Sequence, residues 1–126
     1  MAHDNSSVKP TEAELTLLNV LWNMGPATVR QIHEVVSTTQ KTGYTTVLKI
    51  LQIMHEKSLV IRDESNRAHV YAAAYSQTQT QSSLIKDLIG KAFGGSTSKL
   101  VMRAIDDSTS DQEINDIRQL LNSLEK

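Results

Sequence analysis

Two Thr-x-x-Glu/Gln sequences mark where the first two helices of this chain begin. Thr11 with Glu14, and Thr28 with Gln31, have the spacing of a capping box, in which each side chain bonds the backbone N–H of the other residue. Gly25-Pro26 separates the two segments, because Gly suits the residue after a helix and Pro cannot continue one. The sequence therefore predicts one helix from Thr11 that ends before Gly25, and a short helix after Thr28. Apolar residues recur at helical spacing behind both boxes: Leu15, Leu18, Leu21 and Trp22, then Val29, Ile32, Val35 and Val36.

A third helix is predicted from about Thr42 to Lys57, and its two faces differ in chemistry. The Ser37–Gln40 run interrupts the preceding helix, because small hydroxyl side chains compete for backbone hydrogen bonds. The apolar side chains expected to face a core are Val47, Ile50, Leu51 and Met54. The polar side chains on the opposite face are Thr45, Lys49, Gln52 and Glu56.

The pattern changes after this helix to two short runs rich in β-branched and aromatic residues. They cover residues 59–63 and 68–72, with Glu64–Arg67 between them, and this arrangement predicts a β-hairpin. The end of the second run, Ala73-Ala74, is equally compatible with a helix.

The remainder is predicted to be helical. Gly94-Gly95 closes a first apolar stripe, Ser96 can cap a short helix, and Ser110 with Glu113 has the spacing of a third capping box. With 126 residues, the chain has room for one domain and an appendage. We therefore expect a domain of residues 1–76 and a helical segment of residues 77–126.

The order helix, helix, helix, hairpin, helices predicts a mainly α fold with a small β-hairpin wing. It is typical of a winged helix-turn-helix domain, followed here by a C-terminal helical dimerisation segment. The third helix has the diameter that fits the major groove of DNA. Its polar face, its N-terminus and the basic residues of the wing supply groups that bind base edges or phosphates. The candidate DNA-binding residues are Lys41, Thr42, Tyr44, Thr45, Thr46, Lys49, Gln52, Arg62 and Arg67.

Composition limits the alternatives without deciding between them. The net charge of −1 is low for a nucleic-acid binder, although residues 28–69 carry six basic against four acidic residues. Any solvated helix face carries polar residues, so this chemistry alone leaves DNA contact open. There is no cysteine, no apolar run long enough to span a bilayer, and no signal-peptide pattern in residues 1–7, so we expect a cytoplasmic protein. His33-Glu34 lacks a second ligand at metal-site spacing. We expect no enzyme, catalytic residue, metal site or cofactor.

Several segments resemble the penicillinase-repressor (BlaI/MecI/CopY) family. They are ELTLLNVLW (14–22), TVRQI (28–32), YTTV (44–47), MHEKSLV (54–60), RAHVY (67–71), FGGS (93–96) and the stretch 113–121. Each is weak alone, but their order and spacing are specific, and together they extend from about Thr11 to Leu124. The resemblance implies a homodimeric repressor whose winged helix binds a palindromic operator. It assigns DNA contacts to residues of the 41–49 segment and dimer contacts to Leu84, Leu88, Phe93, Leu100, Val101, Ile117, Leu121 and Leu124.

Two departures from that family concern the inducing signal. Relatives that sense β-lactams are cut at an Asn-Phe bond, whereas the matching region here, Leu100–Ile105, contains none. Copper-responsive relatives carry a C-terminal cysteine cluster, which this chain lacks. An inducer or regulatory protein therefore stays unidentified, and a winged-helix adaptor for protein partners without specific DNA binding remains the alternative function.

Overall fold

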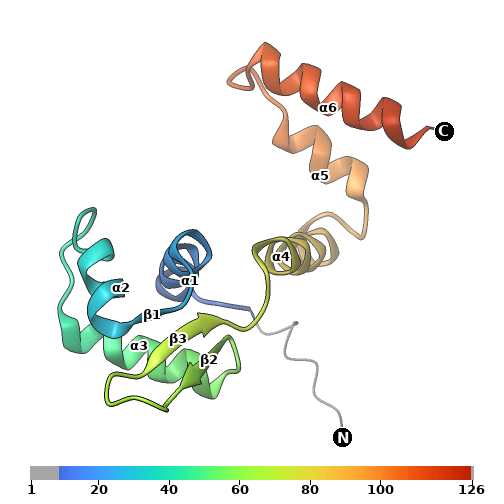
Figure 1. The fold of residues 1–126 in the computed structure, drawn as a ribbon. Coiled ribbons are helices and arrows are strands. Elements are labelled where there is room, and N and C mark those ends of the chain that lie inside the picture. Colours follow the sequence, from blue (N-terminus) through green and yellow to red (C-terminus); the bar gives the residue numbers. More distant parts are fainter. Residues whose placement is uncertain (1–8, 126) are drawn as a thin grey trace, which may run out of the picture. The chain divides into compact units, whose positions relative to one another are not determined.

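The structure is a computed structural model that describes residues 9–125 (Figure 1). The expectation about residues 1–7 lies outside this range. The chain divides into two compact units, the first ending at Ile85 and the second starting at Lys86. The elements are α1 (Glu12–Met24), β1 (Ala27–Thr28), α2 (Val29–Val36), α3 (Tyr44–Glu56), β2 (Val60–Asp63), β3 (Val70–Ala73), α4 (Gln77–Ala92), α5 (Thr97–Ala104) and α6 (Asp111–Leu124).

Both N-terminal capping boxes are confirmed. The Thr11 hydroxyl accepts from the N–H of Glu14 at 3.1 Å, and the Glu14 carboxylate accepts from the N–H of Thr11 at 2.8 Å. Thr28 and Gln31 form the same pair of bonds, at 3.2 and 2.9 Å. These bonds satisfy N–H groups that have no partner inside a helix, and so they fix the starts of α1 and α2.

The predicted hairpin is confirmed, but it belongs to a sheet of three strands that the sequence did not reveal. The strand order is β1-β3-β2, with both pairings antiparallel. Ala27 of β1 pairs with Tyr71 of β3, which in turn pairs with Arg62 of β2. A two-residue strand is too short for any periodic signal. The sequence left the Ala73-Ala74 end of this run compatible with strand or helix. In the structure, β3 extends through Ala73.

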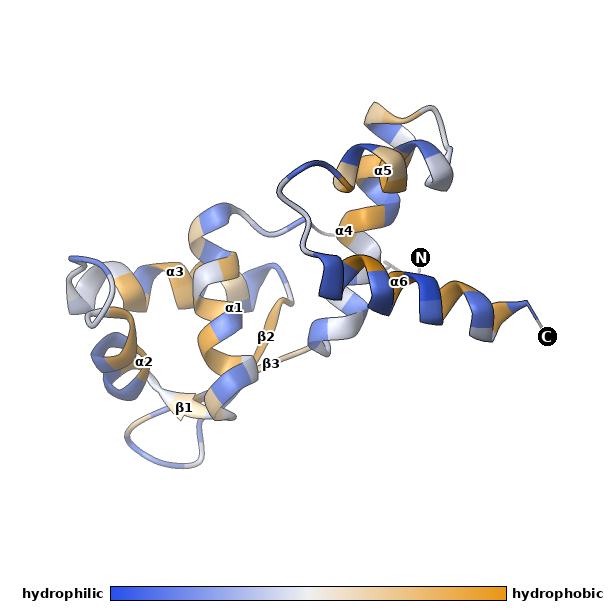
Figure 2. Ribbon diagram, turned by 90° about the horizontal axis from the view of Figure 1, so that it is seen from above, coloured by the Kyte–Doolittle hydropathy of each residue, from blue (hydrophilic) through white to orange (hydrophobic). Residues whose placement is uncertain are grey.

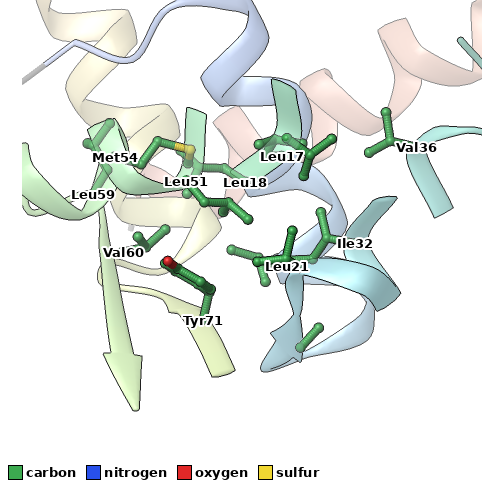
Figure 3. Close-up of a cluster of buried hydrophobic side chains, with 13 residues drawn as sticks. Leu17, Leu18, Leu21, Ile32, Val36, Leu51, Met54, Leu59, Val60 and Tyr71 are labelled. Carbon is green, nitrogen blue, oxygen red and sulfur yellow. The ribbon is translucent and has the colours of Figure 1, made fainter. Parts of the chain in front are cut away.

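A single hydrophobic core joins α1, α2, α3 and the sheet (Figure 3). Tyr71, Ile32, Leu51 and Met54 are among its most deeply buried side chains. Two details differ from the sequence prediction. Leu17 is buried although it lies outside the predicted stripe of α1, whereas Val35 is 42% exposed. The stripe residues Leu15, Trp22 and Ile50 pack only partly against this core.

The C-terminal end of α3 turns through a residue in the left-handed region. Ser58 has φ 63°. The N–H of Leu59 bonds to the carbonyl of Met54 at 2.9 Å, and the N–H of Ser58 bonds to the carbonyl of His55 at 3.1 Å. This is the Schellman motif, completed by the burial of Leu59 and Met54. Gly is the usual residue at the left-handed position, because a Cβ is disfavoured there.

We expect Ser58→Gly to stabilise the first unit by about 0.5–1 kcal/mol. Glycine removes the cost of the left-handed backbone, and this gain exceeds the greater entropy that glycine adds to the unfolded chain. The measurement is urea unfolding followed by the fluorescence of Trp22. Ser37→Gly is the control, since Ser37 has φ −65° and gains nothing from glycine. A Ser58→Gly protein no more stable than the wild type would contradict the assignment.

The second half of the chain is helical, as predicted. Its first helix, α4, starts at Gln77, behind a reciprocal Ser76–Gln79 box with bonds of 2.9 and 3.1 Å. Ser96 caps α5 as predicted. The third predicted box forms only in part: the Ser110 hydroxyl accepts from the N–H of Glu113, whose carboxylate meets that same hydroxyl. No helix of residues 9–125 has both the length and the apolar character needed to cross a membrane.

Candidate nucleic-acid interface

The outer face of α3 is exposed and mostly polar, as the sequence predicted, and it also includes Ile53, which is 38% exposed. Its inner face buries Val47, Leu51 and Met54 in the core. These contacts leave little freedom to the rotation of α3 about its axis, and so they determine which side chains reach solvent. The exposed side chains on this helix include the predicted Tyr44, Thr45, Thr46, Lys49 and Gln52, together with Glu56.

The start of α3 differs from the prediction. The helix begins at Tyr44 with Gly43 as its N-cap, so Thr42 lies in the connection before the helix rather than at its start, while Lys41 precedes the helix as predicted. Helices α1, α2, α5 and α6 have a Ser or Thr cap whose side chain bonds the first turn, whereas Gly43 provides no such bond. The first N–H groups of α3 therefore remain open to an acceptor from outside, at the positive end of the helix dipole.

The connection between α2 and α3 also forms a shallow, open hollow of about 430 Å³. It brings the predicted Lys41 and Thr42 together with Ser37, Thr39 and Gln40. The last three were assigned only a helix-breaking role from the sequence. The sequence shows these residues as a run of hydroxyl and amide side chains next to a lysine. Only the folded turn brings them around one hollow.

The two arginines predicted for the wing have different surroundings. The Nε and Nη2 atoms of Arg62 lie 2.8 and 2.7 Å from Oε2 of Glu64. Hydrogen bonds with Tyr71 and Glu64 raise the pKa of Arg62 above its ordinary value. Arg67 lies exposed in the β2–β3 loop. Thus Arg67 offers its charge directly to a ligand, whereas Arg62 reaches one only in competition with Glu64.

A mostly buried ion pair anchors the other end of α3. The Nζ of Lys57, the C-cap residue, lies 3.0 and 2.9 Å from the two carboxylate oxygens of Glu14, which is 3% exposed. Burial alone raises the pKa of Glu14, but hydrogen bonds from Lys57 and from the backbone of Thr11 outweigh this effect and leave the pKa below its ordinary value. The same carboxylate therefore caps α1 and holds the end of α3.

We expect Lys57→Met to lower the free energy of unfolding by about 2 kcal/mol at neutral pH, because it leaves the Glu14 carboxylate buried without its cation. The expected loss of stability is moderate because the Lys57 side chain is itself 35% exposed. The pair stabilises the fold above the unfolded-state pKa of a glutamate, and this contribution is lost as pH falls through the lowered folded-state pKa. The difference between mutant and wild type should therefore narrow in acid.

Urea unfolding at several pH values, followed by Trp22 fluorescence, measures this difference. Arg30→Met is the matched control in the same unit: it breaks an exposed pair with Glu34, 3.4 Å apart, and should change stability by less than about 0.5 kcal/mol. A difference for Lys57→Met that stays constant with pH would refute the role given to Glu14.

The predicted dimer residues lie on α4, α5 and α6, which bury none of their side chains, except for Phe93, which directly follows α4. Leu88, Val101, Leu121 and Leu124 are exposed, whereas Leu84, Phe93, Leu100 and Ile117 are half-buried. Apolar and polar residues fall on opposite sides of α6 (Figure 2). The prediction missed further exposed apolar residues on these helices and the turn between them, among them Ile85, Met102, Ile105 and Leu120.

Among the described residues, no group of three His, Asp or Glu side chains is placed to hold a metal ion.

The penicillinase repressor profile matches residues 10–123 of the chain. The chain belongs to the penicillinase repressor family. It is 29% identical to the transcriptional regulator BlaI of Mycobacterium tuberculosis over 90% of this chain and 83% of that protein. It is 22% identical to the methicillin resistance regulatory protein MecI of Staphylococcus aureus over 94% of this chain and 98% of that protein. Among solved structures, a mutant of Lactococcus lactis ZitR aligns with 98% of this chain and 79% of its own, at a TM-score of 0.43 and 16% identity.

Membership in this family confirms the resemblance found from the sequence segments. It identifies the chain as a transcriptional repressor of the BlaI and MecI type. The elements of the first unit agree with the predicted mainly α fold and its small β wing.

Proposed function

We propose that this member of the penicillinase repressor family acts as a homodimer on a palindromic DNA operator. The observation that carries the proposal is the outer face of α3, which is exposed and polar while Val47, Leu51 and Met54 fix its inner face in the core. A helix held in this way can enter the major groove as a rigid element. Residues 1–76 would form the DNA-binding domain and residues 77–126 the dimerisation domain.

The residue types suggest a division of roles along this surface. Thr45 and Thr46 can contact base edges or a thymine methyl group, and Gln52 can bond adenine with both of its amide atoms. Lys41, Thr42 and Tyr44 stand next to the uncapped N-terminus of α3, where a phosphate is favoured. The remaining candidates, Lys49, Arg62 and Arg67, supply positive charge for phosphates, and Lys49 can also reach guanine.

The C-terminal helices supply the argument for the homodimer. Three helices without one buried side chain do not make a core, and the exposed leucines of α6 leave apolar surface in water. A second copy would cover this surface across a two-fold axis, which suits the symmetry of a palindromic operator. A dimer also places two DNA-binding domains at high effective concentration on adjacent half-sites.

Such a protein would repress by occupying the operator and excluding the polymerase, in the cytoplasm where bacterial DNA lies. Neither the Asn-Phe bond nor the cysteine cluster of its relatives is present, so we propose a release signal of another kind. The protein needs no cofactor in this scheme.

We expect Thr46→Ala and Lys49→Ala each to weaken operator binding by about 1–3 kcal/mol. Loss of a base contact at Thr46 should relax sequence preference, whereas loss of a phosphate contact at Lys49 should also reduce the salt dependence by about one charge. The operator is first selected from fragments of the source genome, and affinity is then measured by fluorescence anisotropy at two salt concentrations.

The controls are Thr78→Ala and Lys86→Ala, which remove the same side chains from exposed positions of α4. They should bind the operator as the wild type does. Wild-type affinity in both α3 variants would exclude α3 as the recognition helix. Recovery of the wild-type protein with a protein partner but no specific DNA would favour the adaptor function instead.

The dimer is tested by the double variant Leu121→Lys with Leu124→Lys. These side chains are 54% and 72% exposed, and each would contribute about 1–2 kcal/mol if a second copy buried the part that is exposed. We expect a monomer in sedimentation equilibrium, with operator affinity reduced more than about tenfold because two half-sites are no longer bound together. Ile61→Lys, at an exposed apolar residue of β2, should leave the oligomeric state unchanged. A double variant that stays dimeric would rule out α6 as the dimer contact.

A further inference from the structure

The connection between α2 and α3 is longer than the three or four residues common in a helix-turn-helix motif. It runs from residue 37 to residue 43. Its first half is tied closely to the end of α2: the N–H of Thr38 bonds to the carbonyl of Val35, and those of Thr39 and Gln40 bond to the carbonyl of Val36, all at 3.1 Å. The hydroxyls of Thr38 and Thr39 bond to these same two carbonyls, at 2.7 and 3.2 Å.

The second half of the connection is held by a side chain of α2. The Nε2 atom of His33, a half-buried residue, lies 2.9 Å from the carbonyl oxygen of Thr42. Because a carbonyl only accepts, Nε2 must carry the proton and donate. The His33 ring also packs edge-on against the ring of Tyr44, with 6.1 Å between ring centroids and 78° between planes. His33 therefore contacts both the connection and the first residue of α3.

Little else determines where the first turn of α3 lies. Its N-cap, Gly43, has no side chain and gives no capping bond. The buried contacts of α3 begin only at Val47, one turn further on. Within the described residues, the bond from His33 is the side-chain hydrogen bond that reaches the 41–43 segment from another element.

We propose that His33 is a positioning residue for DNA recognition, which acts through Thr42 and Tyr44 to place the N-terminal turn of α3. This inference rests on the proposed function, because it assumes that this turn contacts DNA. Base contacts depend on the position of α3 to within a fraction of an ångström, whereas attraction to phosphates tolerates small shifts. Loss of the His33 bond should therefore reduce specific binding more than nonspecific binding.

The test compares three substitutions at this position for the selected operator and for a random duplex of equal length. His33→Ala should lower operator affinity about three- to tenfold, the range expected from one neutral hydrogen bond, and change random-duplex affinity by less than about twofold. His33→Phe keeps a ring against Tyr44 but cannot donate, and should show most of that loss. His33→Gln can place an amide N–H near the position of Nε2, and should recover most of the wild-type affinity.

Glu34→Gln is the matched control on the same helix, at an exposed residue that pairs with Arg30. It should leave both affinities unchanged. The melting temperature of each variant separates positioning from folding. Equal losses for operator and random duplex, in proportion to lost stability and without recovery in His33→Gln, would assign His33 a structural role only and overturn the inference. Failure of the wild-type protein to bind any operator would instead refute the proposed function.

Discussion

The structure of the first unit depends on the burial of one face of α3. Val47, Leu51 and Met54 pack with residues of α1, α2 and the sheet into a single hydrophobic core, beside Tyr71 of the central strand. Because helical side chains repeat every 3.6 residues, burying these three positions commits the opposite positions to solvent. The polar face of α3 is therefore a consequence of core packing as much as of its own residue types. A substitution in the core that rotated α3 would change the surface offered to a ligand without altering one surface residue.

Different interactions hold the two ends of this helix. At the C-terminal end, a Schellman motif and the Lys57–Glu14 pair join α3 to the start of α1, and both involve groups removed from water. At the N-terminal end, a glycine cap and an exposed connection provide fewer constraints, and the contacts of His33 are the main ones. Most of the DNA contacts proposed for α3 lie toward its looser N-terminal end, and Gln52 is the one nearer the better-fixed end. This distribution suits a protein whose low net charge leaves specificity to a few well-placed groups rather than to a broad positive field.

The C-terminal helices differ from the first unit because they have local caps but no core of their own. Their caps at Ser76, Ser96 and Ser110 define each helix locally, yet none of the helices buries a side chain in a single chain. Local signals can thus specify helices that have no core of their own, because caps and propensities act over a few residues, whereas a core needs apolar surface from several elements. In a homodimer that surface would come from the second copy. The folding of these helices would then be coupled to the dimerisation that brings two DNA-binding domains together on the operator half-sites.

The sequence by itself determined the features that depend on neighbours a few residues apart. The capping boxes at Thr11 and Thr28, the two-faced pattern of α3, the hairpin and the cap at Ser96 were all predicted from the spacing or composition of short segments, because each depends on local hydrogen bonds or a local period. Only the tertiary structure decided what depends on distant residues. The two-residue strand β1 exists because β3 pairs with it, and the carboxylate of Glu14 is held by Lys57, 43 positions away. The bond from the Trp22 indole to the carbonyl of Tyr75 crosses 53 positions. Thr42, the predicted first residue of the helix, lies outside α3 because the start of α3 is set by Gly43 and the connection from α2. Such contacts require the chain to close over long segments, and their partners are chosen by the shape of the finished core rather than by any local pattern.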